Sequence, residues 1–328
     1  MTITPLATRL FDSAPEAGDG LNAWLIKGAR ECQRSGVKPD RAFALIANTV
    51  VARGGEIFEH DINKAISKAY SQSHTSGTYD PRPVWPEPNL DLIEQITMER
   101  IRQNPSVLND LRRLSQENPD QPTSDIIQKL FPLNSLISAG IDTSSTTTFE
   151  FSRVRERLHR FQFVVPSPMS AKIGLTQEGK ESGRCLSNTG PRRFLVTEFD
   201  FKSTSDNGKR TKWAPLIDLW QANGATVQDA CAAIILHLKQ YGPLVMVVYS
   251  GGKSLHGWWY CAGEDEQEGS RLHKFMAGAA RLGADTKTYT RSQFVRMPGA
   301  ARPDGRKQTV HYLDTDLTRR EKRAHANI

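Results

Sequence analysis

Two apolar runs on either side of a glycine turn constrain the fold more than any other stretch of the chain. The run at residues 244–249, L-V-M-V-V-Y, is typical of a buried strand, and the S-G-G-K segment at residues 250–253 follows it. The two glycines permit the positive φ angles of a tight turn, and a second strand is expected over residues 255–261. The sequence therefore predicts a β-hairpin. Ser254 and His256 stand two residues apart, so on a strand they face the same side.

The turn of this hairpin carries groups that suit an anion. Lys253 supplies a cation next to the hydroxyl and imidazole that follow it, and a glycine turn leaves room for a ligand such as a triphosphate. The G-K-S triplet does not complete a P-loop, because that motif requires glycine at the position of Val247 and a helix after the lysine. We therefore expect phosphate binding of another class.

Composition narrows the class of protein. The chain has 328 residues, enough for two domains, and no apolar run approaches the ~20 residues of a membrane span. Its four cysteines are scattered without a C-x-x-C pair, which excludes a zinc ribbon and does not indicate a disulfide framework. The first residues lack the apolar core of a secretion signal. We expect a cytoplasmic protein without a membrane partner.

The positive charge flanks the predicted hairpin. The formal net charge is +7, with 13 Lys and Arg against 6 Asp and Glu over residues 151–213, and 10 against 5 over residues 285–328. Such an excess is compatible with nucleic-acid binding, although runs of charge are more often a solvated surface.

The pattern of apolar residues and breakers divides the chain into five parts. Helical spacing predicts a small helical bundle within residues 1–79, and four prolines predict a stiff linker at residues 80–88. Residues 89–145 are expected to form a helical accessory region. Strands alternate with helices over residues 146–317, which predicts an α+β domain with a mixed β-sheet flanked by helices. Residues 318–328 are expected to be a basic tail.

Carboxylates on both sides of the hairpin are candidate metal ligands. Glu198 and Asp200 lie at i and i+2 of a predicted strand, so both face one way. Two such carboxylates in one site require a shared proton or a divalent cation, whereas on a solvated strand face they need neither. Asp285 follows a helix stop and is the third candidate. Asp314 and Asp316 form a rival pair, which we interpret as surface residues.

Together these pieces resemble the archaeo-eukaryotic primase superfamily. Its pattern is an acidic pair on a strand, then S-x-H in a hairpin, then a lone acidic residue; here these look like residues 198–200, residues 254–256 and Asp285. The R-M-P-G segment at residues 296–299 is similar to the arginine-containing strand that follows the third motif. The resemblance covers residues 151–317 and is strongest to the primase-polymerase branch of bacterial, phage and plasmid replication modules. The first motif is often an Asp pair; a glutamate here keeps its metal-binding ability.

The resemblance implies a fold and a reaction. It implies a primase-like catalytic domain that makes or extends primers on single-stranded DNA from nucleoside triphosphates, using two Mg²⁺ or Mn²⁺ ions. It assigns the metals to Glu198, Asp200 and Asp285, which with His256 are the expected catalytic residues. The nucleotide ligands that it implies are Ser254, His256, Lys253, Arg296 and Arg184. A helicase or another replisome protein is a further implied partner.

Several alternatives stay open at the level of sequence. The chain could be a catalytically silent replication-initiation or defence factor that binds nucleic acid or a nucleotide, or a repair polymerase that fills gaps. Trp258 and Trp259 alternate on the second strand of the hairpin, so each is either a stacking platform for bases or a core residue.

Overall fold

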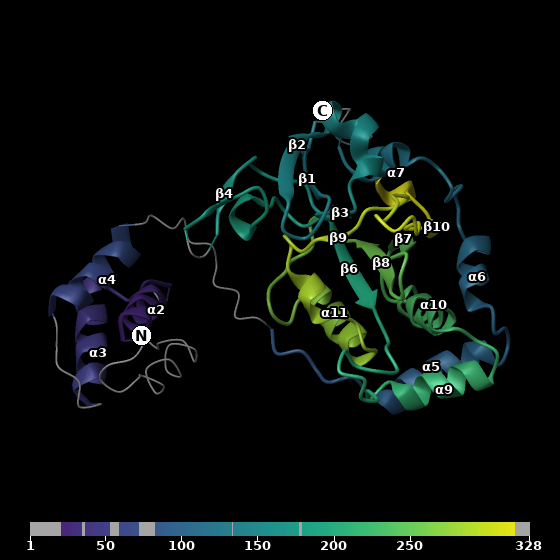
Figure 1. Cartoon of the computed structure of the whole chain (residues 1–328), viewed down its shortest axis with the longest axis horizontal. Coiled ribbons are helices and arrows are strands. Elements are labelled where there is room, and N and C mark those ends of the chain that lie inside the picture. Colours follow the sequence, from purple (N-terminus) through teal and green to yellow (C-terminus); the bar gives the residue numbers. More distant parts are fainter. Residues whose placement is uncertain are drawn as a thin grey trace. The chain divides into compact units, whose positions relative to one another are not determined.

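The chain contains two compact units. The computed structural model describes residues 21–34, 37–52, 59–71, 83–132, 134–176 and 179–318. Contacts between residues divide the chain into the units Met1–Arg82 and Pro83–Ile328 (Figure 1). None of the helices in these described ranges has the length and apolar character that crossing a bilayer requires.

The first unit is a group of three helices. They are α2 (Leu21–Arg34), α3 (Pro39–Ala52) and α4 (Glu59–Ser71). Each contributes to one buried apolar cluster, for example through Trp24, Ile46 and Ile62. The helical segments expected within residues 1–79 are therefore present, whereas residues 1–20 and 72–79 lie outside the described ranges.

The second unit is organised around a four-stranded sheet, the central sheet. Its strands lie in the order β10, β7, β8, β6, with bounds β6 (Phe194–Phe199), β7 (Leu244–Tyr249), β8 (Leu255–Tyr260) and β10 (Val310–Leu313). The predicted hairpin is confirmed: β7 and β8 pair antiparallel on either side of the glycine turn. Side chains of β6 alternate between two apolar clusters, because successive residues point to opposite faces of a sheet.

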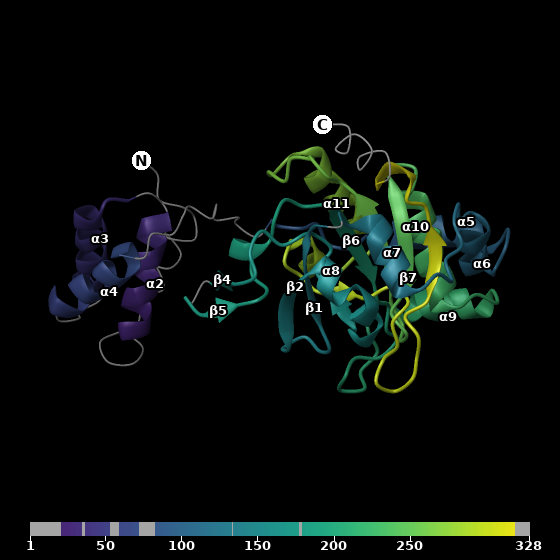
Figure 2. The ribbon, with the colours of Figure 1, turned by 90° about the horizontal axis from the view of Figure 1, so that it is seen from above.

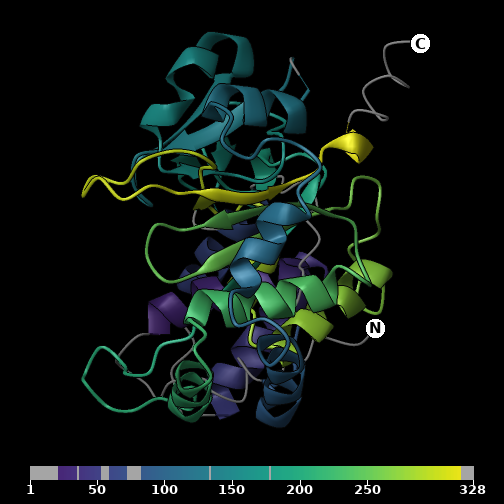
Figure 3. The ribbon, with the colours of Figure 1, turned by 90° about the vertical axis from the view of Figure 1, so that its right-hand side faces the viewer.

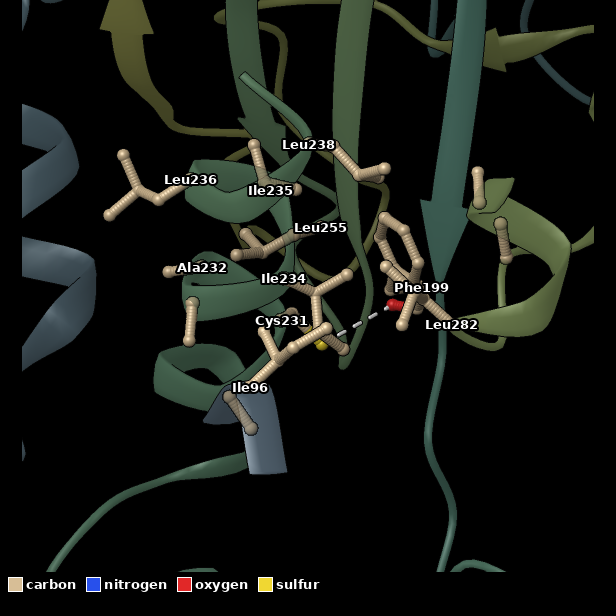
Figure 4. Packing of buried hydrophobic residues seen from close by; sticks show 14 of the residues in the cluster. Ile96, Phe199, Cys231, Ala232, Ile234, Ile235, Leu236, Leu238, Leu255 and Leu282 are labelled. Carbon is tan, nitrogen blue, oxygen red and sulfur yellow. Dashed lines mark hydrogen bonds between the residues drawn. The ribbon is translucent and has the colours of Figure 1, made fainter. Parts of the chain in front are cut away.

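Helices cover one face of the central sheet, and a second sheet covers the other (Figures 2 and 3). The helical layer consists of α5 (Leu90–Ile101), α6 (Val107–Arg113), α9 (Ala214–Ala222), α10 (Val227–Leu238) and α11 (Arg271–Arg281). α10 begins at a capping box, in which the Thr226 hydroxyl accepts from the Asp229 N–H. Figure 4 shows Ile234 and Leu238 of this helix beside Leu255 of β8, which places α10 directly on the sheet.

The second sheet has the order β2, β1, β3, β9. Its strands are β1 (Leu136–Gly140), β2 (Thr146–Glu150), β3 (Phe163–Val164) and β9 (Val295–Arg296). The elements that accompany it are α7 (Thr123–Leu130), α8 (Phe151–Val154), the 3₁₀ turns η1 (Arg155–Arg160), η2 (Leu186–Asn188) and η3 (Thr286–Tyr289), and a separate hairpin of β4 (Gly174–Leu175) and β5 (Glu181–Ser182). Ile137, Val164 and Val295 of this sheet share a buried cluster with Val196 and Trp258 of the central sheet, so the two sheets pack face to face.

The expected mixed sheet is wrong for the described residues. Every paired strand is antiparallel to its neighbours. The alternation of strands and helices that suggested a mixed sheet does include a helical crossover, because α9 and α10 connect β6 to β7. However, β8 folds back between these two strands and pairs with both, so β6 and β7 run in the same direction without touching.

The accessory region expected at residues 89–145 is built into the second unit. Its end at residue 145 would separate β1 from its partner β2. Ile93 of α5 and Val107 of α6 lie in the same buried cluster as the central sheet. The end of the proline-rich segment also packs here, since Trp85 stacks on His273 with ring centroids 5.0 Å apart. Beyond Thr318, the expected basic tail lies outside the described ranges.

Candidate active site

The strand register brings the first two motifs together. Glu198 lies directly opposite His256 in the β6–β8 pairing, and the Glu198 Oε1 atom is 3.4 Å from His256 Nε2. The Ser254 hydroxyl is 3.2 Å from the same imidazole nitrogen. Ser254 and His256 are both about 95% or more buried. The three side chains therefore form one polar cluster at the end of β6 and the start of β8.

Electrostatics keep Glu198 ionised. Burial raises the pKa of this carboxyl, but the charge and hydrogen bond of His256, the hydrogen bond of Ser254 and the charge of Arg296 outweigh it and lower the pKa to about 2. Only 28% of the side chain is exposed, so these interactions act in a setting of low dielectric constant, where they are strong. Glu198 is thus a permanent anion at physiological pH.

Arg296 reaches this cluster from the facing sheet. It lies on β9, and its guanidinium carbon is 4.4 Å from the centroid of the Phe163 ring, a cation–π contact that orients it. Burial lowers the pKa of Arg296, and the charge of Arg302 lowers it further. Phe163 stacks in turn on Phe294, with centroids 5.8 Å apart. Arg296 is therefore fixed by packing with its charge near Glu198.

Arg184 is held by the backbone instead. It lies over the other side of the aromatic pair, 4.1 Å from the Phe294 centroid. Its Nη1 donates to the Ser292 carbonyl and its Nη2 to the Thr143 carbonyl, both at 3.2 Å. These contacts tie two loops together, so Arg184 serves the architecture around the site in this structure.

Asp200 lies one residue beyond β6, near Glu198. Its Oδ2 atom is 3.6 Å from Lys202 Nζ, and its Oδ1 atom is buried without a hydrogen-bond partner. A buried carboxylate oxygen without a donor is costly unless a cation approaches it. This oxygen is the feature of the site that best fits a divalent metal ion.

The third motif is attached to the first through the backbone. α11 ends at Arg281, and Gly283, two residues further on, has a φ of +89° that lets the chain turn sharply. The Asp285 N–H then donates to the Glu198 carbonyl at 2.8 Å. The Asp285 side chain is exposed and accepts from the Lys287 N–H at 3.0 Å. The backbone of Asp285 therefore lies beside Glu198, while its carboxylate is hydrogen-bonded within the turn that follows it.

Within the described parts of the chain, no three His, Cys, Asp or Glu side chains are grouped as metal ligands. The structure therefore joins Glu198 to His256 but does not gather the three expected carboxylates into one ligand set. The donor chemistry still fits Mg²⁺ or Mn²⁺, because two carboxylates stand at the end of one strand and one oxygen of Asp200 lacks a partner.

The glycine turn is covered by Arg302, a residue that the sequence did not single out. A Cβ at Gly251 would lie 2.9 Å from Arg302 Cδ, and one at Gly252 would lie 2.9 Å from Arg302 Nη1. Arg302 therefore lies directly over the two glycines, beside the exposed Lys253. Adjacent glycines at a strand end were the available signal, because such glycines often admit a second segment of backbone or side chain.

Two secondary expectations are settled by packing. Trp258 and Trp259 are both fully or almost fully buried, on opposite faces of the central sheet, so neither is available to stack on a base. Trp259 also donates from Nε1 to Thr197 Oγ1 at 2.9 Å. In the rival acidic pair, Asp316 is exposed and Asp314 lies 3.4 Å from the Tyr312 hydroxyl.

Comparisons with known proteins add no family assignment. No protein-family model, no curated protein and no solved structure matches this chain. The functional interpretation therefore depends on the motifs in the sequence and on the geometry of the cluster around Glu198.

Proposed function

We propose that this chain is a DNA primase-polymerase, which transfers nucleotides from nucleoside triphosphates to a strand growing on single-stranded DNA. The observation that carries the proposal is the convergence of three motifs that are distant in sequence. Glu198 lies opposite His256, and the Asp285 N–H binds the Glu198 carbonyl. Short motifs that matched by chance would not be expected to lie together at one end of one sheet.

The residues of the cluster suit a triphosphate. Ser254 and His256 offer a hydroxyl and an imidazole from one strand, and Arg296 brings a fixed positive charge from the opposite sheet. Such groups bind and orient phosphate oxygens, and Arg296 neutralises the charge that develops on the leaving pyrophosphate. Because Glu198 stays ionised, it serves as an anionic ligand and not as a proton donor.

Two divalent ions complete the proposal. Glu198, Asp200 and Asp285 would hold them, and the ions would supply Lewis-acid activation of the attacking hydroxyl and of the transferred phosphoryl group. Asp200 contributes an oxygen that has no hydrogen-bond partner. Asp285 contributes only if it gives up its hydrogen bond to the Lys287 N–H.

The hydrogen bond between the Asp285 carboxylate and the Lys287 N–H favours a second candidate function. A chain whose third carboxylate stays bound to its own turn would bind a nucleotide or nucleic acid without turnover, as a silent replication-initiation or defence factor does. A gap-filling repair polymerase would share the proposed chemistry and differ only in its DNA substrate.

Primer synthesis and primer extension test the proposal directly. Purified full-length chain is incubated with single-stranded template, all nucleotides and Mg²⁺ or Mn²⁺, and the products are resolved by length. We expect metal-dependent products, and we expect Glu198→Gln and Asp200→Asn to reduce their rate roughly a hundredfold or more, because each removes charge that stabilises the transition state.

The matched control is Glu268→Gln, the same substitution on an exposed loop, which should retain full activity. If the wild-type chain makes no product with either metal, the primase-polymerase proposal is refuted. Nucleotide binding that persists in that case would support the silent alternative. A preference for gapped duplex over single-stranded template would support the repair polymerase.

A further inference from the structure

Two hairpin turns beside the candidate site have the same construction. In the first turn, the Ser205 N–H donates to the Lys209 carbonyl and the Gly208 N–H donates to the Ser205 carbonyl. In the second turn, the Arg302 N–H donates to the Arg306 carbonyl and the Gly305 N–H donates to the Arg302 carbonyl. All four N···O distances are 2.8 or 2.9 Å. Each turn has its glycine at positive φ, +77° at Gly208 and +81° at Gly305. This is a type I turn closed by a glycine bulge.

The two turns also carry the same charge pattern. Directly after its glycine, each places two consecutive cations, Lys209 with Arg210 and Arg306 with Lys307. All four of these side chains are exposed; the two arginines form ion pairs, Arg210 with Asp218 and Arg306 with Asp304, so the two lysines are the better residues to substitute. The β4–β5 hairpin repeats the turn, since the Gly179 N–H donates to the Thr176 carbonyl, but a single lysine followed by a glutamate comes after its glycine. The paired cations are therefore a feature of the two hairpins, not of the turn type.

Both hairpins project from the end of the central sheet at which the candidate site lies. β6 and β7 end there, and β8 and β10 begin there, as the antiparallel order requires. The 205–210 hairpin follows β6 at one edge, and the 302–307 hairpin precedes β10 at the other edge. Figures 2 and 3 show the two loops extending to the same side of the molecule.

The glycine turn of the β7–β8 hairpin lies between the two hairpins, so the three turns form a row along this end of the central sheet. Arg302 lies over Gly251 and Gly252, so the outer hairpin and the middle turn are in contact. Together, residues 201–212, 250–254 and 300–308 carry eight Lys and Arg against two Asp. The row spans four strands, or roughly 14 Å between its outer strands. Glu198 and His256 lie at the same strand ends.

We propose that these two hairpins, here called the paired hairpins (residues 205–210 and 302–307), bind the phosphate backbone of a single-stranded nucleic acid on either side of the candidate site. Exposed lysines and arginines at fixed turns attract successive phosphates and release their counterions, with little dependence on base sequence. The identity of the strand as single-stranded DNA template rests on the proposed function; the backbone contact can be measured without any catalysis.

The test measures binding of a labelled oligothymidylate to the full-length chain by fluorescence anisotropy, in the presence of a chelator and at several salt concentrations. The variant is Lys209→Ala with Lys307→Ala, one exposed lysine from each hairpin. We expect affinity to fall roughly tenfold near physiological salt, and the slope of log affinity against log salt to become shallower by about 1.4, or about 0.7 per lost contact.

Three controls make the result specific. Lys180→Ala removes the lysine of the β4–β5 hairpin, which has the same turn, and should leave the affinity and slope unchanged. Lys209→Arg with Lys307→Arg keeps the charge and should bind as the wild-type chain does. A duplex of equal length should bind more weakly than the single strand.

An unchanged affinity and slope in the double alanine variant would overturn the proposal, as would a wild-type chain that does not bind the oligonucleotide. Tighter binding of the duplex through the same two lysines would overturn the single-strand assignment. Glu198→Gln separates the two proposals, because it should reduce synthesis roughly a hundredfold or more and retain binding. A wild-type chain that binds through the paired hairpins but makes no product would refute the proposed function and support the backbone contact.

Discussion

At the scale of single residues, the cluster around Glu198 predicts a response to acid. The pKa of this carboxyl is lowered from its ordinary 4.5 to about 2, so folding favours its ionised form. The resulting stability is present in full above about pH 4.5 and is lost as the pH falls toward 2. A shift of this size corresponds to at most about 3 kcal/mol.

We therefore expect the free energy of unfolding of the metal-free wild-type chain to change relative to that of Glu198→Gln by up to about 3 kcal/mol between pH 5 and pH 2. Urea unfolding at a series of pH values measures this difference. Glu268→Gln serves as the reference for an exposed glutamate. A difference that stays constant over this range would show that the partners of Glu198 do not stabilise its charge.

The same cluster shows which parts of the site the sequence could predict. The common face of Ser254 and His256 follows from the period of two along a strand, and the structure has them together. The approach of Arg302 to the glycine turn could not be predicted, because it depends on the packing of a hairpin some fifty residues away in sequence. The orientation of the Asp285 carboxylate toward its own turn likewise depends on local backbone geometry.

At the scale of elements, the β7–β8 turn depends on Gly251. Its φ is +73°, which side chains other than glycine adopt at a cost of roughly 1–2 kcal/mol. A Cβ there would also lie 2.9 Å from Arg302 Cδ and 3.0 Å from the Lys307 carbonyl oxygen. Gly263 has a similar φ of +81°, but a Cβ at that position would meet nothing within 4 Å.

Alanine variants of these two glycines distinguish the cost of backbone strain from the cost of steric crowding. We expect Gly263→Ala to lower the free energy of unfolding by roughly 1–2 kcal/mol and Gly251→Ala to lower it further, because only the second must also displace the 302–307 hairpin. Chemical denaturation of the two variants measures the difference. Equal losses would mean that Arg302 moves aside without cost and is not held by the turn.

Element order illustrates a limit of sequence patterns. Alternating strands and helices correctly predicted a helical crossover between β6 and β7, which in the structure runs through α9 as well as α10. The pattern does not state which strands become neighbours, and β8 takes the place between them because it is joined to β7 by a short turn. The short turn between β7 and β8 therefore determines the strand order, and the sheet is antiparallel although a helical crossover joins β6 to β7.

At the scale of the whole molecule, the first residues of the unit Pro83–Ile328 contribute to both large buried clusters of that unit. Strand β1 is hydrogen-bonded to both β2 and β3, and α5 and α6 bury Ile93 and Val107 against the helical layer. A domain that began at residue 146, the boundary predicted from the sequence, would lack α5, α6 and β1. A domain that begins at residue 83, the boundary found from contacts, keeps all three elements.

Truncation distinguishes these two boundaries. We expect a fragment of residues 83–328 to unfold in one cooperative thermal transition and to show the proposed nucleotide and DNA binding to the same extent as the full chain. A fragment of residues 146–328 should lack a cooperative transition, because it exposes the apolar surface that α5, α6 and β1 cover. Circular dichroism during heating measures both.

A fragment of residues 86–328 refines the comparison. It keeps every strand and helix of the unit and the α5 N-cap Asn89, but it loses Trp85, which contacts His273 and Tyr289 with ring centroids 5.0 and 4.8 Å apart. Two aromatic pairs contribute about 2 kcal/mol, so its transition should fall roughly 5 °C below that of residues 83–328. A cooperative transition in the 146–328 fragment would show that the unit folds without α5, α6 and β1. An unchanged transition in the 86–328 fragment would show that Trp85 does not stabilise the unit.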